Sequence, residues 1–423
     1  MSQWMNKKVL INIFSLLSIQ GVGYLIPLLT LPYLVKVLGP YSYGIYGYTL
    51  AIIQYSILIV DFGFNLSITK KISIIRDDVE LVSKTYWNVM ACKLILIVCA
   101  FIFSGCWTIA DHVFTGEYQY VLIIAFSAVV GNMLFPVWLF QGKEEMAKVA
   151  ISSITSKILA VPAIFLLIHS PEDVWLVALI NGLTFILSGC IALAIVIEKK
   201  WIKWYSPTWP EMKLELASAW HIFISTAAIN IYTGSITVIL GIFTNPTIVG
   251  YFTAADKIRL AIQGLIGPVS QALYPRINAL MKNNREHAFD VIRKLLKVQG
   301  GIAFIISLLL FIYSKELILF LYGSDYHSSI VIMKILSGMP FIIAVSNIFG
   351  YQTLLVLNMA KMFSKIVITG GVIAMICIFP AVYSYGALGA AITVLITELV
   401  VNQLMMYVII KNKLPIFCKG TNV

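Results

Sequence analysis

Eight ionisable side chains lie inside stretches of this 423-residue sequence that are otherwise apolar. A charge in the hydrocarbon region of a membrane is costly, so such groups usually face a protein interior or a water-filled cavity and act on ions or substrates. Five of the eight are basic, which favours an anionic solute. The basic residues are Lys93, Lys157, Lys257, Arg259 and Lys334, and the acidic residues are Asp61, Asp256 and Glu398.

These groups differ in their distance from the ends of the apolar stretches. Arg259 and Glu398 lie near the middle, where a long stem cannot reach water, so we expect a functional interior or, as the alternative, a structural ion pair. Lys157 lies about 12 Å from a stretch end at 1.5 Å per residue. Lys93 and Lys334 lie near the ends, and for these two we favour an ammonium group that extends to water.

Polar residues recur at helical spacing in the stretch 250–273, and Asp256 and Arg259, three residues apart, can pair. The stretch 217–243 has a looser polar face. Two such faces predict a polar cavity between the halves of the chain, although hydrogen bonds between helices would explain the hydroxyl and amide groups equally well. His221 alone fits a packed or interfacial histidine. The first face comprises Thr253, Asp256, Arg259, Gln263 and Ser270; the second includes Ser218, His221 and Ser225, with Asn230 on a neighbouring face.

The apolar stretches predict an all-α integral membrane protein with twelve transmembrane helices. About 18 apolar residues suffice to cross the hydrocarbon layer, and only helices or closed barrels satisfy their backbone hydrogen bonds there. The alternating pattern of a barrel is absent from the sequence. The predicted spans are 10–36, 44–65, 87–110, 119–141, 149–169, 174–197, 217–243, 250–273, 297–315, 329–357, 365–383 and 387–410.

Charges between the stretches predict the topology. Lys and Arg concentrate in every second loop and at both ends of the chain, whereas the loops between these carry Asp and Glu. Because cytoplasmic loops are enriched in Lys and Arg, both termini are predicted to be cytoplasmic. The net charge of +11 is therefore a topology signal, and its dispersal over many loops argues against nucleic-acid binding.

Two halves are indicated by a linker and by a weak repeat. Residues 201–210 (WIKWYSPTWP) lie near the middle of the chain, and their prolines predict an irregular segment. Pro40 and Gly44 recur as Pro246 and Gly250, 206 residues later. We therefore predict a bundle at 1–200, a cytoplasmic linker at 201–210 and a bundle at 211–423, that is, two six-helix bundles around a central cavity.

The motifs of common enzymes are missing from the sequence. It has no GxxxxGK[ST] loop, no HExxH and no GxSxG, and its five histidines are scattered. We expect no enzymatic activity, no cofactor and no metal site.

Four segments resemble the O-antigen flippases of the Wzx type, which form part of the polysaccharide transport family within the multidrug/oligosaccharidyl-lipid/polysaccharide (MOP) exporter superfamily. Residues 27–44 (PLLTLPYLVKVLGPYSYG) are the most specific of the four. The others are 61–64 (DFGF), 135–142 (FPVWLFQG) and 249–258 (VGYFTAADKI). The span number, the short loops and the two-half layout extend the resemblance over essentially the whole chain.

The resemblance implies a function. A flippase of this family would move an undecaprenyl-diphosphate-linked oligosaccharide across the bacterial cytoplasmic membrane by alternating access, coupled to an ion gradient. It also implies membrane lipids as surroundings, and a polysaccharide polymerase and a chain-length regulator as partners. Arg259 suits bidentate phosphate contacts, whereas lysines act as point charges. The residues assigned to substrate binding are Arg259, Lys257, Lys157, Lys93, Gln263, His221 and Asn230, and those assigned to ion coupling are Asp61, Asp256 and Glu398.

Other classes remain open at this point. A multidrug–cation antiporter of the same superfamily would prefer an acidic cavity, whereas cations outnumber carboxylates within these spans. A membrane polysaccharide polymerase or acyltransferase would need a large outer loop or a catalytic cluster. A structural scaffold would leave Arg259 unexplained.

Overall fold

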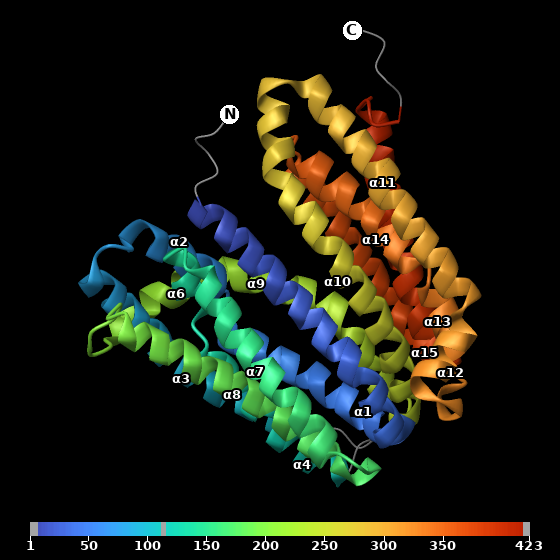
Figure 1. The fold of residues 1–423 in the computed structure, drawn as a ribbon, viewed down its shortest axis with the longest axis horizontal. Coiled ribbons are helices and arrows are strands. Elements are labelled where there is room, and N and C mark those ends of the chain that lie inside the picture. The colour runs from blue at the N-terminus through green and yellow to red at the C-terminus, as the bar shows by residue number, and fades with distance from the viewer. Residues whose placement is uncertain (1–6, 111–115, 418–423) are drawn as a thin grey trace. The chain divides into compact units, whose positions relative to one another are not determined.

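The computed structural model describes residues 7–110 and 116–417, and every regular element in these ranges is a helix (Figure 1). The earlier helices are α1 (Lys7–Asp61), α2 (Phe64–Ile75), α3 (Val79–Ala110), α4 (Glu117–Ala125), α5 (Ser127–Leu134), α6 (Val137–Gly142), α7 (Met146–Leu167), η1 (Pro171–Asp173), α8 (Val174–Glu198) and α9 (Trp209–Phe243). The later helices are α10 (Pro246–Asn283), α11 (Arg285–Ile312), α12 (Ser314–Tyr322), η2 (Ser324–Tyr326), α13 (Ser329–Leu336), α14 (Met339–Asn347), η3 (Ile348–Leu355) and α15 (Ala360–Lys411).

Several of the helices are long and apolar enough to span a membrane. Eight helical segments of the described residues meet this requirement, which makes the chain a multi-pass membrane protein. The prediction of an all-α membrane protein is confirmed, and the number of twelve spans stays a prediction. The predicted positions of the termini are not tested either, because residues 1–6 and 418–423 lie outside the described part.

Two helices are each interrupted at a glycine. The 55 residues of α1 and the 52 of α15 would each extend about 80 Å as straight helices, far more than the ~30 Å hydrocarbon layer. Gly39 (φ 67°) breaks α1 and Gly386 (φ 54°) breaks α15, in a backbone region that glycine adopts readily. Each break separates two of the predicted spans, 10–36 from 44–65 and 365–383 from 387–410.

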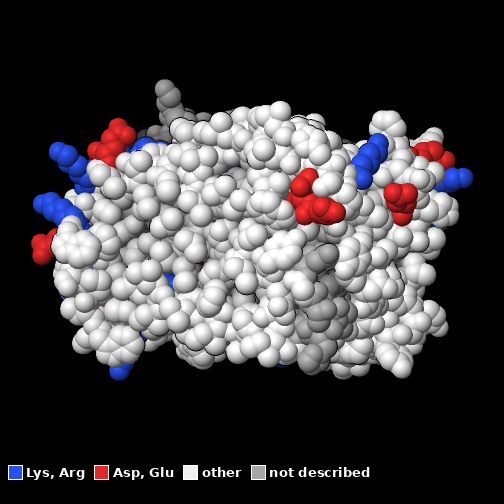
Figure 2. Space-filling view, turned by 90° about the horizontal axis from the view of Figure 1, so that it is seen from below, with Lys and Arg blue, Asp and Glu red and all other residues white. Residues whose placement is uncertain are grey.

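The chain forms two compact units, Met1–Gly250 and Tyr251–Val423. In the first unit, α8 packs against α4, α5 and α7, and α1 packs against α3, α7 and α9. Charged side chains of this unit gather at the left margin of Figure 2, and the broad face beside them is largely uncharged. The division into bundles at 1–200 and 211–423 stays a prediction.

The segment between α8 and α9 is irregular over residues 201–208, as its prolines predict, and it is held firmly against α3. The backbone N–H of Lys203 donates to Ser83 Oγ at 2.8 Å, and Trp87 Nε1 donates to the Lys203 carbonyl at 2.9 Å. The rings of Trp87 and Trp204 are 4.4 Å apart. The predicted linker is thus a packed part of the first unit.

In the second unit, α11 packs against α13 and α14, and α15 packs against α13, α14 and η3. Its core includes Ile292, Phe349, Leu354 and Met405. η3 is a π-helix, in which the wider i→i+5 turn changes the direction of the side chains that follow it. This turn places Phe349 and Leu354 in the core between α11 and α15.

Candidate functional site

A largely buried arginine on α10 organises the polar face predicted in the stretch 250–273. Arg259 Nε donates to Asp256 Oδ1 at 2.6 Å, and Arg259 Nη1 donates to Gln263 Oε1 at 2.9 Å. The side chains of Arg259 and Asp256 are 12% and 18% exposed. The spacing of three and four residues puts all three groups on adjacent turns, so the helix itself forms the cluster. The predicted pairing of Asp256 with Arg259 is confirmed.

The guanidinium of Arg259 retains binding capacity in this cluster. A guanidinium has five N–H donors in a planar fork, and the two hydrogen bonds above are those it makes among the described residues. Asp256 fixes the orientation of the side chain from the Nε side. The Nη2 edge is left for an external acceptor, and phosphate oxygens match its geometry.

Two further polar atoms on the same helix are buried and have no hydrogen-bond partner among the residues that the structure describes. They are Gln263 Nε2, a donor, and Thr253 Oγ1, which can donate or accept. Buried polar groups normally find a partner, so these two atoms are free to contact a polar ligand or water. The side chain of Ser270, the last member of the predicted face, lies outside the described residues.

Lys257 and Glu398 lie in the same unit as Arg259. Lys257 follows Asp256 on α10 and is partly buried. Glu398, from α15, is partly buried and lies within electrostatic range of Arg259. Arg259 is therefore influenced by two carboxylates, one bonded to it and one from another helix.

Asp61 and Lys93 form an ion pair in the first unit. Lys93 Nζ lies 3.0 Å from Asp61 Oδ1, and the lysine side chain is only 1% exposed. The prediction that Lys93 extends to water is therefore wrong. The physical reason is that Asp61, the last residue of α1, offers the ammonium a partner inside the protein, and a paired charge is much less costly to bury than an isolated one.

The other predicted binding residues of the first unit lie on α7 and α9. Lys157 on α7 is partly buried, and His221 on α9 is exposed. Asn230 Nδ2 donates to the Thr226 carbonyl of its own helix at 2.9 Å. An amide that donates to a carbonyl of its own helix is satisfied without a ligand. The structure therefore adds no support for a binding role of Asn230.

Sequence reasoning missed a charged network at the start of α9. Glu211 accepts from Lys84 and from Asn88 Nδ2 at 2.8 Å, and Glu215, which is 4% exposed, pairs with Lys71. These pairs join α9 to α2 and α3. The one signal in the sequence is the spacing of Glu211 and Glu215, which places two carboxylates on one helical face but does not identify their partners.

Aromatic residues extend this contact. The rings of Phe62 and Phe223 are stacked with centroids 4.6 Å apart, and a Cβ on Gly63 would meet the backbone N of Phe223 at 2.9 Å. Gly63 has φ 77°, which also favours glycine. The DFGF segment thus packs its turn tightly against α9.

The sequence matches one protein family and curated relatives over most of its length. The family model described as polysaccharide biosynthesis protein matches residues 9–281. A protein of Escherichia coli (strain K12), named provisionally as an O-antigen transporter, is 38% identical over 406 residues, which cover 95% of this chain and 97% of the relative. A protein of Shigella dysenteriae with the same provisional name is 29% identical over 403 residues, which cover 93% of this chain and 98% of the relative.

Solved membrane transporters share the fold. The lipid II flippase MurJ in an inward closed conformation has a TM-score of 0.71 at 14% identity, over 97% of this chain and 89% of that chain. An inward-facing multidrug resistance MATE family transporter of the MOP superfamily has a TM-score of 0.68 at 13% identity, over 98% of this chain and 97% of that chain. At these identities the likeness concerns the fold alone, and it agrees with the architecture predicted from the sequence.

Proposed function

Because the chain belongs to the polysaccharide biosynthesis protein family, we propose that it moves a lipid-linked oligosaccharide from the inner to the outer leaflet of the bacterial cytoplasmic membrane. Two relatives carry names that refer to O-antigen transport, and a solved protein with this fold is a lipid II flippase. The substrate class follows from these names together with the chemistry of α10.

The observation that carries the proposal is the state of Arg259. Its guanidinium, on α10, is largely buried, is oriented by Asp256, and retains N–H donors for an anion. A diphosphate offers paired oxygens that accept two parallel hydrogen bonds from one guanidinium, and such bonds are strong where water is excluded. Lys257 adds a second positive charge on the same helix.

The unpaired groups of Thr253 and Gln263 fit the sugar part of the substrate. Sugar hydroxyls both donate and accept hydrogen bonds, so they complement an amide N–H and a hydroxyl. We infer that Lys93 and Asn230 contribute less to binding, since both already make bonds within the protein, whereas Lys157 and His221 stay proposed binding residues.

A multidrug–cation antiporter is the rival from the same superfamily, and its fold is shared. The balance of charge in the spans opposes it, because five basic residues accompany three acidic ones. One of those carboxylates, Asp256, is bonded to Arg259, and another, Asp61, is bonded to Lys93, which lowers their attraction for a cationic drug.

The proposed mechanism is alternating access driven by an ion gradient. Asp61, Asp256 and Glu398 are the proposed coupling groups, because a carboxylate can exchange a basic partner for a proton or a sodium ion and so favour one of two states. Both termini are proposed to be cytoplasmic, with transport rather than catalysis as the activity. A polysaccharide polymerase and a chain-length regulator are the proposed partners on the outer side.

Reconstituted vesicles with a fluorescent lipid-linked oligosaccharide test the proposal. Arg259→Gln should reduce the translocation rate at least about tenfold, since an interaction worth more than 1.4 kcal/mol is removed, and Arg259→Lys should restore only part of it. Arg285→Gln, which changes an exposed arginine, is the matched control and should transport normally. Full transport by Arg259→Gln would remove this residue from the mechanism, and absence of transport by the unmodified protein would contradict the function.

A further inference from the structure

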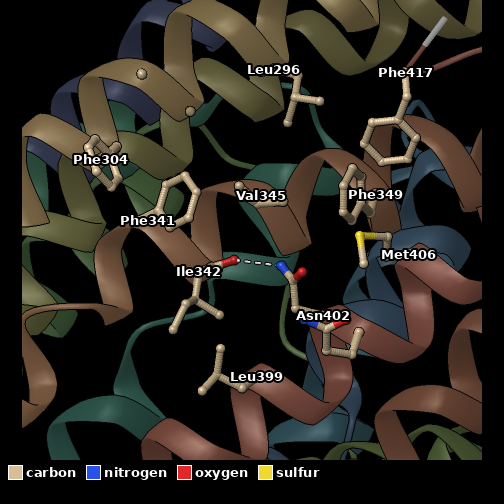
Figure 3. Close-up of a pocket in the computed structure, with 13 residues that line it drawn as sticks. Leu296, Phe304, Phe341, Ile342, Val345, Phe349, Leu399, Asn402, Met406 and Phe417 are labelled. Carbon is tan, nitrogen blue, oxygen red and sulfur yellow. Dashed lines mark hydrogen bonds between the residues drawn. The ribbon is translucent and has the colours of Figure 1, made fainter.

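The second unit contains a pocket of about 520 Å³ whose walls are mostly apolar (Figure 3). It lies between α11, α14, η3 and α15, and Phe417 closes one end. Phe304, Phe341, Val345, Phe349, Leu399 and Met406 form most of its surface. Phe304, Leu399 and Phe417 are 52%, 39% and 51% exposed, so the pocket opens to the outside of the unit.

Two adjacent glycines keep the pocket open on the side of α11. A Cβ on Gly301 would have no atom within 4 Å, and a Cβ on Gly300 would meet only Leu296 Cδ1 at 3.9 Å. These glycines are therefore not required by close packing. Any larger side chain at position 301 would occupy the pocket itself.

The main polar group of the opposite wall is turned into the protein. Asn402 Nδ2 donates to the Ile342 carbonyl at 3.2 Å and to Ser346 Oγ at 3.0 Å, as the dashed line in Figure 3 shows for Ile342. The exposed side chain of Gln403 also lines the pocket, and the rest of the surface that remains for a ligand is made of rings and aliphatic side chains. A polar ligand would find few partners there, whereas a hydrocarbon chain would be well matched.

The pocket lies within helices long enough to cross a membrane. It extends from Leu296 to Phe304 on α11, about 12 Å along the helix axis. Its residues on α15, from Leu399 to Met406, cover a similar length. A lipid chain is therefore the occupant that fits both the apolar walls of the pocket and its position within these helices.

Basic residues surround the end of the pocket formed by Leu296 and Phe417. Lys297 lies on the face of α11 that also carries the pocket residues Gly300 and Phe304. Its side chain extends toward the start of the helix, that is, toward the Leu296 end of the pocket. Lys294, three residues before Lys297, and Lys413, four residues before Phe417, are also exposed. Arg293 Nη1 donates to the Pro415 carbonyl at 2.9 Å and so holds the segment that carries Phe417. This charge fits a lipid with an anionic head group.

Through α15 the pocket has a connection to the cluster on α10. Leu399, which lines the pocket, directly follows Glu398, and Glu398 is within electrostatic range of Arg259. The pocket and the group assigned to diphosphate binding are therefore linked through α15. A carrier lipid uses this link, because its head group must pass from the basic end of the pocket to Arg259, whereas an ordinary phospholipid does not.

We propose that the pocket lined by Phe304, Val345, Phe349 and Leu399 is a loading site for the isoprenoid chain of the carrier lipid, with its phosphate near Lys297 and Lys413. This inference rests on the proposed function and adds to it the position of the lipid chain. The chain enters the pocket from the cytoplasmic leaflet, and the head group then passes to Arg259.

A photoreactive undecaprenyl phosphate with a diazirine in its chain tests the site on the purified full-length protein. Cross-linked peptides should come from α11, η3 or α15. Gly301→Leu should weaken binding at least about tenfold, the equivalent of losing the burial of about two methylene groups. Gly105→Leu is the matched control, because Gly105 is also a helical glycine with no atom within 4 Å of an added Cβ. Lys297→Gln should weaken binding without filling the pocket, and Lys199→Gln, at an exposed position in the first unit, should not.

The competing outcomes are distinguishable. Labelling elsewhere, or equal binding by Gly301→Leu and Gly105→Leu, would overturn the loading site. Equal competition by excess phosphatidylglycerol would also overturn it, because the pocket would then be a general lipid site. If the unmodified protein translocates lipid-linked glycan in vesicles while the pocket stays unlabelled, the loading site alone fails. If the pocket is labelled but no glycan crosses, the proposed function fails and the lipid site stands.

Discussion

Gly44 and Gly250 pack reciprocally: a Cβ on Gly44 would overlap the Pro246 carbonyl, and a Cβ on Gly250 would overlap the Pro40 carbonyl. Each glycine thus lies against the proline that precedes its counterpart by four residues. Reciprocal contacts of this kind are the mark of a local two-fold relation. The weak sequence repeat at an offset of 206 residues is therefore also a contact, in which both copies need glycine for the same reason.

Gly44→Ala and Gly250→Ala should each destabilise the protein. The added methyl group meets backbone atoms, which cannot move away cheaply, so we expect a loss of about 1–3 kcal/mol. Thermal unfolding in detergent measures this loss as a lower midpoint. Gly105→Ala, where nothing lies within 4 Å, should leave the midpoint unchanged or raise it. Equal unfolding midpoints for all three variants would show that the contact between the segments of Gly44 and Gly250 is looser than described.

Removing one partner of the Asp61–Lys93 pair should destabilise the first unit. Lys93 is 1% exposed, so Asp61→Asn would leave a buried ammonium without its counter-charge, at a cost of about 3 kcal/mol. Lys93→Met should have a similar effect. The double variant Asp61→Leu/Lys93→Met should recover most of the loss, because no uncompensated charge remains.

The double variant also separates two roles of the pair. If it is stable and transports with normal dependence on the ion gradient, the pair is structural. If it is stable but transports independently of the gradient, Asp61 is a coupling group. A double variant less stable than either single variant would contradict the ion-pair account.

Glu211 should stabilise the contact between α9 and α3 at neutral pH and lose this effect in acid. The hydrogen bond from Lys84, followed by those from Asn88 and Tyr205, lowers the pKa of Glu211 from 4.5 to about 2. Because folding favours the ionised carboxylate, its contribution is complete above pH 4.5 and disappears as the pH falls toward 2. Glu211 precedes the predicted span 217–243, so it titrates in contact with water.

Unfolding midpoints of the unmodified protein and of Glu211→Gln measure this contribution as a function of pH. The difference between them should be constant from pH 5 to 7 and shrink below pH 4.5. Glu198→Gln, which changes an exposed residue at the end of α8, should show no such trend. A difference that is independent of pH down to 3 would contradict the role of the ionised carboxylate.

Glu398→Gln should uncouple transport from the ion gradient. The amide keeps the size of the side chain but removes a charge within range of Arg259, so the two states would no longer respond to a proton or sodium ion at this position. Vesicles with an imposed pH or sodium gradient report the effect as equal rates with and without the gradient. An undiminished gradient dependence would leave Asp61 or Asp256 as the coupling residue.

The features predicted correctly from the sequence depend on neighbouring residues. The apolar stretches predict helices because the period and hydropathy of a stretch are local properties, and the breaks at Gly39 and Gly386 separate spans that the sequence had placed apart. The Asp256–Arg259 pair could be predicted because residues three apart on a helix always lie on adjacent turns.

The prediction for Lys93 failed because its partner is 32 residues away on another helix. Distance to the end of a span indicates whether a lysine could reach water, but it does not indicate which carboxylate lies closer. The same limit applies to the ion pair of Lys84 and Glu211. It also applies to the pocket, because its walls are formed by helices from different parts of the chain.

The sequence by itself therefore determined an all-helical membrane protein, the positions of most spans and the basic cluster on α10. Only the tertiary structure decided that Asp61 neutralises Lys93, that the two glycines of the repeat meet, and that Gly301 faces an open pocket. The physical reason is that hydropathy and helical period act between residues a few positions apart. Ion pairing, close backbone approach and unfilled space depend on which helices pack together.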